Sequence, residues 1–255
     1  MKIGFSLSSS AIAAALLTAS IASATPIGEF SIGIVTSGSV TVSASEIDWR
    51  PPTGAGFGDF ATGEPTNINY DGGTVTSSTN PYGRILDLTF APVSVPNFIQ
   101  FYVGAVQPTP PGNGVLQPYP VFDLTEVVAG GSAQGALDDC AGVTAVGASC
   151  SPLIGGMFVS PFVLTNRPNN TVDVSLSVEL LGRDSSGSIP WFGGFTTQIR
   201  DMNASMIQDV INAGGTITNT FSGTFSSAPI PEPGTYMLLG SGLFLFGYAR
   251  RRFSR

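Results

Sequence analysis

The chain has 255 residues, of which 42% are hydrophobic and only 11% are charged, and its formal net charge is −7. It contains no histidine, and its one lysine is Lys2, so residues 25–229 exclude sites that need an imidazole base or a catalytic lysine. That segment carries 16 carboxylates and five arginines, a net charge of −11, which would repel nucleic acid and anionic lipid.

The first 24 residues have the pattern of a secretory signal peptide. Lys2 precedes an apolar run rich in alanine and leucine, which ends at Ala22-Ser23-Ala24. Small residues at positions −3 and −1 before Thr25 are typical of cleavage by signal peptidase. We therefore predict that Ala22 and Ala24 direct cleavage after Ala24, and that residues 25–229 form one exported β-rich domain.

Eight segments between residues 30 and 225 have the alternation, or the β-branched and aromatic content, of strands. In the clearest, 171–181, apolar residues occupy every second position, so one face is buried and the other is wet. The other expected strands are 30–42, 84–90, 97–106, 121–128, 157–165, 191–199 and 215–225. Many short strands joined by glycine and proline turns suit a sandwich or a barrel, and we expect an all-β fold, an antiparallel β-sandwich of the jelly-roll or Ig-like type.

Two proline-rich segments, 51–67 and 107–120, are expected to be loops. Cys140 and Cys150 are separated by nine residues of a segment rich in glycine, alanine and serine. In an exported chain this spacing predicts a disulfide. A metal site or a reactive thiol is the alternative, which the lack of histidine and of a third cysteine disfavours.

One segment, 201–213, has helical rather than strand periodicity. Its apolar residues fall on one helical stripe, and two glycines follow it as a stop signal. We predict a single short helix there, with a core-facing stripe of Met202, Met206, Ile207, Val210 and Ile211.

The C-terminal segment combines a Pro231-Glu232-Pro233 motif, an apolar run and a basic cluster. The run covers 236–249, about 21 Å of helix, which is short for a bilayer core of about 30 Å. Arg250, Arg251 and Arg252 follow it at once and fit a cytoplasmic stop under the positive-inside rule, whereas a buried core helix is the alternative.

These three features, in this order at the end of an exported chain, resemble the PEP-CTERM sorting signal. The resemblance implies that residues 230–255 are a sorting tail with a transmembrane helix, which an exosortase-type membrane protease removes. It further implies export through the inner membrane, a place at the cell surface, in the envelope or in the medium, and association with exopolysaccharide. It implies no activity for residues 25–229.

Carboxylate-pair chemistry is the enzymatic route that the residue inventory leaves open, since glycoside hydrolysis needs only two carboxyl groups. The candidate pairs closest in sequence are Glu46 with Asp48, Asp123 with Glu126, and Asp138 with Asp139. The alternative is that these are ordinary surface or turn residues. Stacking on sugar rings is a second possible role, for Trp49 with Arg50, and for Trp191 and Phe192 with Phe195. The alternative is that these aromatic side chains pack in the core.

We therefore expect a non-catalytic protein of the cell surface or extracellular matrix, with no cofactor, no metal and no nucleic-acid partner. Its expected partners are signal peptidase, an exosortase and extracellular polysaccharide. The alternatives are a carbohydrate-binding module and a carboxylate-based glycoside hydrolase.

Overall fold

The computed structural model describes residues 26–36, 38–50, 55–89 and 94–228. The chain divides into two units, residues 24–229 and the two ends, and every described residue belongs to the first. The predicted signal peptide and sorting tail lie outside the described residues. Across the ranges given above, no helix has both the length and the apolar character needed to cross a membrane.

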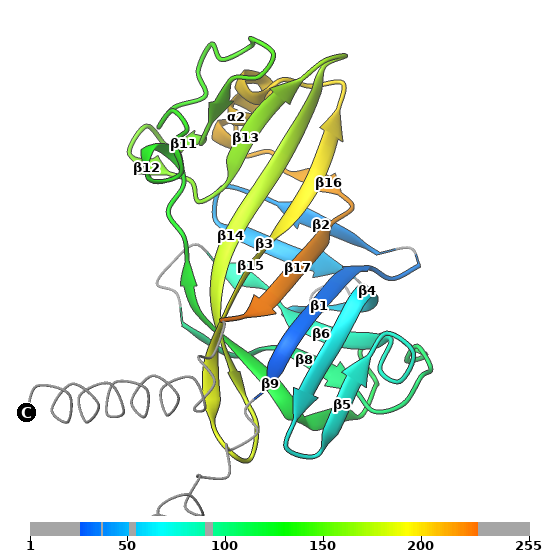
Figure 1. Cartoon of the computed structure of the whole chain (residues 1–255). Helices are drawn as coiled ribbons and strands as arrows, with labels where there is room; N and C mark the ends of the chain where they lie inside the picture. The colour runs from blue at the N-terminus through cyan, green and yellow to red at the C-terminus, as the bar shows by residue number, and fades with distance from the viewer. Residues whose placement is uncertain (1–25, 37, 51–54, 90–93, 229–255) are drawn as a thin grey trace, which may run out of the picture. The chain divides into compact units, whose positions relative to one another are not determined.

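The largest sheet closes on itself as an antiparallel barrel of eight strands (Figure 1). The barrel strands are β1 (Ile27–Ile34), β4 (Phe57–Tyr70), β6 (Tyr82–Leu86), β8 (Val95–Tyr102), β9 (Leu116–Val127), β14 (Thr171–Arg183), β15 (Ser188–Arg200) and β17 (Ser222–Ser227). Neighbours run β14, β15, β17, β1, β4, β6, β8, β9, and β9 pairs with β14 to close the ring. The expected sandwich is therefore wrong for the main sheet, because β9 and β14, which would be edge strands of an open sheet, pair with each other.

Further strands extend the barrel sheet and form a second one. On the barrel sheet, β10 (Ser149–Cys150) and β13 (Val163–Arg167) continue beyond β14, and β5 (Gly73–Thr76) pairs with β4. The second sheet has the order β16 (Ile217–Asn219), β2 (Ser39–Val42), β3 (Glu46–Arg50) and β7 (Leu88–Thr89). The remaining elements are the hairpin of β11 (Leu153–Ile154) and β12 (Phe158–Val159), the 3-10 helix η1 (Gly131–Gln134) and the helix α2 (Ala204–Asn212).

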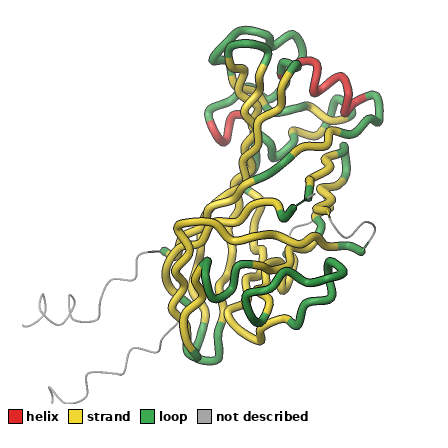
Figure 2. Tube along the Cα trace, turned by 90° about the vertical axis from the view of Figure 1, so that its right-hand side faces the viewer, coloured by secondary structure: helices red, strands yellow, loops and turns green. Residues whose placement is uncertain are grey.

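The β14–β15 hairpin links the barrel to the second sheet. Its strands pair over 13 residues, but β9 reaches only Val178 to Arg183 of β14, so the other half extends past the barrel. There Phe195 of β15 packs on Trp49 of β3, with ring centroids 5.4 Å apart. Helix α2 lies at the far end of the long strands, away from the barrel (Figure 2).

Aromatic side chains fill the barrel. Phe30 contacts Phe101, Phe122, Trp191 and Phe225, with ring centroids 4.8 to 5.7 Å apart, and all five residues are buried. An eight-stranded barrel is just wide enough for side chains to fill. Glycines make room for these rings, because the register places three of them directly opposite an aromatic residue: Phe60 with Gly83, Phe122 with Gly182 and Phe225 with Gly193.

All eight predicted strand segments contain strands, and four of them divide. Segment 30–42 becomes β1 and β2, 84–90 becomes β6 and β7, 157–165 becomes β12 and β13, and 215–225 becomes β16 and β17. The expected loop over 51–67 is wrong from Phe57 onward, because β4 begins there. The expected loop over 107–120 ends earlier than predicted, since β9 begins at Leu116.

The short helix and the disulfide are confirmed. The side chain of Asn203 caps α2 by accepting the backbone N–H of Met206. The helix buries Ala204, Ile207 and Ile211, but Met206 is 45% exposed, so its predicted place in the core stripe is wrong. Cys140 and Cys150 are bonded, and both are fully buried.

Candidate functional site

The aromatic residues considered for sugar stacking are mostly core residues. Trp49, Trp191 and Phe195 are buried, and the indole Nε1 of Trp191 donates to the backbone oxygen of Pro26 at 3.0 Å. Phe192 is the exception, with 46% of its surface exposed. The packing interpretation is therefore confirmed for three of these four side chains, and stacking on sugars is wrong for them.

The three acidic pairs are engaged in local structure. Asp48 forms an ion pair with Arg50 at 2.7 Å, and Asp123 forms one with Arg183. Asp138 and Asp139 accept hydrogen bonds from Ser132 and from Ala141 and Gln208. Among the described residues there is no group of three or more acidic, cysteine or histidine side chains that could hold a metal ion.

Asp87 is the carboxyl group whose pKa is clearly raised, and the sequence did not single it out. It lies between β6 and β7, and its Oδ1 accepts the backbone N–H of Trp49 at 2.8 Å. Burial raises the pKa of this carboxyl group, whereas the hydrogen bond from Trp49 lowers it, and the negative charges of Asp48 and Glu46 add to the rise. The resulting pKa is about 6, compared with an ordinary value of 3.8. The raised pKa depends on a contact between segments 38 residues apart, which leaves no local signal.

A wide polar groove of about 950 Å³ runs over the outer face of the extended sheet, across β13, β14, β15, β17 and the end of β1. The alternation of 171–181 predicted an outward polar face, and the register aligns it with polar residues of the neighbouring strands, because Thr165 pairs with Asp173 and Asp173 pairs with Gln198. The polar side chains lining the groove are Thr165, Arg167, Asp173, Ser175, Thr196, Thr197, Gln198, Thr220 and Ser222.

An ionic network organises the centre of this groove. Asp173 accepts a hydrogen bond from the amide of Gln198 at 3.0 Å and one from the guanidinium of Arg167. The amide hydrogen bond, followed by the bond and charge of Arg167, lowers the pKa of Asp173, so it is ionised at neutral pH. Beside it, the hydroxyls of Thr196 and Ser222 lie 3.1 Å apart. Such a set of donors and acceptors suits a ligand rich in hydroxyl groups.

Residues 229–252 match the PEP-CTERM protein-sorting motif. This match confirms the resemblance of the C-terminal segment and marks the chain as an exosortase substrate. The motif indicates export and sorting to the cell surface. Comparisons with curated proteins and with solved structures find no match to the chain.

Proposed function

We propose that this chain is a non-catalytic protein of the cell surface or extracellular matrix, delivered by its sorting tail and released from that tail by an exosortase. The observation that carries the proposal is the sorting motif at 229–252. The folded unit then serves as a durable acidic β-rich module outside the cell.

The state of the carboxylates supports a role without catalysis. Asp123 and Asp173 are tied to arginines. Asp59 is buried and accepts the hydroxyl of Tyr102 at 2.6 Å and the backbone N–H of Gly112 at 2.8 Å. A glycosidase instead needs one carboxyl group free to donate a proton and another facing the same sugar.

The processing test compares the intact mass of the exported protein with and without an active exosortase. With the protease, we expect a protein that ends near Pro231; replacement of Pro231, Glu232 and Pro233 by alanine blocks that shortening. Replacement of Arg250, Arg251 and Arg252 by neutral residues removes the charge that holds the tail inside, so the full-length chain escapes into the medium. A wild-type protein that still ends at Arg255 beside an active exosortase contradicts the proposal.

Polysaccharide binding is the second candidate, and the polar groove favours it. Phe192 lies on the same outward face of β15 as Thr196 and Gln198, so an exposed ring shares the face that carries the hydrogen-bonding network. Native gels cast with the cell's own exopolysaccharide measure this binding as slower migration. We expect Gln198→Ala and Phe192→Ala to migrate faster than wild type in such gels. Thr224→Ala, an exposed position outside the groove, is the matched control.

Two results separate the sorting proposal, polysaccharide binding and the glycoside-hydrolase alternative from one another. Identical migration with and without polysaccharide removes the binding candidate and leaves the sorting proposal intact. New reducing ends in a polysaccharide incubated with the protein would indicate a glycoside hydrolase and would contradict the non-catalytic proposal.

A further inference from the structure

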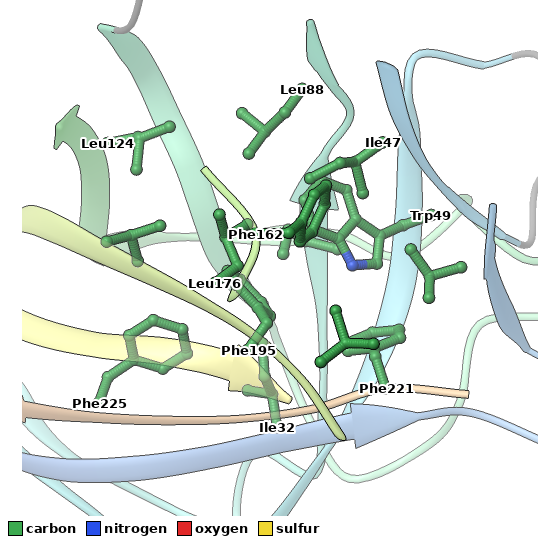
Figure 3. Packing of buried hydrophobic residues seen from close by; sticks show 14 of the residues in the cluster. Ile32, Ile47, Trp49, Leu88, Leu124, Phe162, Leu176, Phe195, Phe221 and Phe225 are labelled. Carbon is green, nitrogen blue, oxygen red and sulfur yellow. The ribbon is translucent and has the colours of Figure 1, made fainter. Parts of the chain in front are cut away.

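An apolar cavity of about 60 Å³ lies between the second sheet and the extended half of the β14–β15 hairpin, and α2 forms part of its wall. Figure 3 shows the packing at this place, with Trp49 and Ile47 facing Leu176, Phe195 and Phe221. Water is stable in a cavity that offers it two to four polar partners. This cavity is far larger than the roughly 10–15 Å³ that one water requires, yet its wall is almost wholly apolar.

Two polar atoms in this wall have no hydrogen-bond partner among the residues that the structure describes. The indole Nε1 of Trp49 and the hydroxyl Oγ1 of Thr197 are both inaccessible to solvent, and Trp49 as a whole is 1% exposed. The indole nitrogen lies on the side of its ring that faces Phe195 and Phe221 (Figure 3). The other tryptophan, Trp191, has a partner for the same atom.

An unpartnered buried donor of this kind points to a missing acceptor. Leaving a buried donor without a partner destabilises the fold by about the free energy needed to remove that donor from water. Native structures therefore give nearly all buried donors a hydrogen-bond partner. A ligand oxygen would satisfy the indole N–H and could also accept the hydroxyl proton of Thr197. Because no arginine or lysine of the described ranges lines the cavity, a carboxylate would be buried there without a counter-ion, so we infer a neutral acceptor.

A second cavity lies next to the first. Its volume is about 250 Å³, and it shares Ile47 and Leu176 with the first cavity as a common wall. The remaining lining is again mostly apolar: Leu88, Thr89, Val127, Ala129, Phe158, Val159 and Pro161. Phe158 is 48% exposed, so this cavity lies close to solvent on that side.

We propose that this pair of cavities binds a neutral molecule with an alkyl chain and one carbonyl oxygen, such as a ketone, an ester or a lactone. The oxygen accepts the indole N–H of Trp49, and the chain occupies the apolar space past Ile47 and Leu176. This binding does not involve the sorting tail, so it does not depend on the proposed sorting function. The first cavity and the outer groove share Thr196, Thr197 and Phe221 as lining residues.

The test uses 2-heptanone and its hydrocarbon counterpart 2-methyl-1-heptene, in which a methylene group replaces the oxygen. Binding to residues 25–229 is followed by thermal shift and by tryptophan emission. We expect saturable binding of the ketone, and Trp49→Phe should lower its affinity about ten-fold while the affinity for the alkene stays within two-fold. Trp191→Phe identifies Trp49 as the source of the emission change.

A second variant keeps the test decisive if Trp49→Phe fails to fold. Thr197→Val keeps the size of the side chain and removes only the hydroxyl group, so we expect it to lower the affinity for the ketone but not for the alkene. Thr224→Val, on the exposed face, is the control and should leave both affinities unchanged. No saturable binding of 2-heptanone would overturn the proposal. Equal losses for ketone and alkene in both variants would overturn it as well.

Discussion

The side-chain oxygen of Gln208, in helix α2, accepts the backbone N–H of Cys140 at 2.9 Å. The same oxygen accepts the backbone N–H of Leu153 at 2.9 Å, and the amide nitrogen of Gln208 donates to Asp139 at 2.7 Å. One buried glutamine therefore joins the helix to both sides of the disulfide loop, which has little regular structure of its own.

We expect Gln208→Leu to lower the free energy of unfolding by about 2–4 kcal/mol, because two backbone N–H groups lose their acceptor at once. Urea denaturation measures the change. Asp209→Ala, an exposed neighbour on the same helix, should change it by less than about 0.5 kcal/mol. Equal stabilities of the two variants would show that the loop does not depend on this glutamine.

The glycine at position 83 is required by the ring opposite it. A Cβ at Gly83 would lie 2.3 Å from the ring of Phe60 and 2.4 Å from the backbone oxygen of Gln100. We therefore expect Gly83→Ala to destabilise the barrel by about 3 kcal/mol through overpacking. Gly63→Ala, on the neighbouring strand β4, is the control, since its Cβ would meet only Ser31, at 3.8 Å. The expectation fails if both alanines are tolerated equally in thermal unfolding.

The long hairpin could be predicted from sequence, whereas the closed barrel could not. Alternation over 171–181 fixes which side of β14 is buried, and the structure agrees. Closure depends on the pairing of Leu180 with Leu124, 56 positions apart, and no local pattern encodes that contact. Strand β4 escaped prediction because its buried residues include Gly58 and Asp59, residue types that are rare in strands, and because burial of three consecutive residues breaks the expected alternation.

The candidate sites show the same division. The polar outer face of β14 follows from alternation, so that part of the groove was predictable, but its alignment with the polar residues of β13 and β15 required the register. The paired cavities depend on Trp49 meeting Phe195 and Phe221 from distant segments. The sequence marked Trp49 only as an aromatic residue of ambiguous role.

The Cys140–Cys150 bond should stabilise the unit by about 2–3 kcal/mol, the chain-entropy value for so short a loop. We expect a Cys140→Ala, Cys150→Ala double variant to unfold at a correspondingly lower urea concentration. Thiol labelling of the unreduced, unfolded wild type should modify neither cysteine. Stoichiometric labelling at both positions would contradict the bond.

The last prediction concerns pH and rests on Asp87. Its pKa is about 6 in the folded state against 3.8 as the ordinary value, so between these pH values the folded chain holds more protons than the unfolded one. The contribution of Asp87 to stability is therefore greatest below about pH 4 and is lost as the pH rises through about 6. Asp87→Asn keeps an oxygen for the N–H of Trp49 but removes the charge.

We expect Asp87→Asn to be more stable than wild type at pH 7.5 by about 1 kcal/mol, a value reduced for the partial exposure of the carboxyl group, with the difference vanishing near pH 4. Asp184→Asn is the matched control of opposite sign. Although burial raises the pKa of Asp184, hydrogen bonds from Asp71, Ser186 and Gly187 lower it overall. Its substitution should therefore destabilise at pH 7.5, and the loss should shrink as the pH falls below about 4. Urea titrations at pH 4, 5.5 and 7.5 measure both, and a constant difference between Asp87→Asn and wild type across these pH values would show that Asp87 does not titrate with a raised pKa.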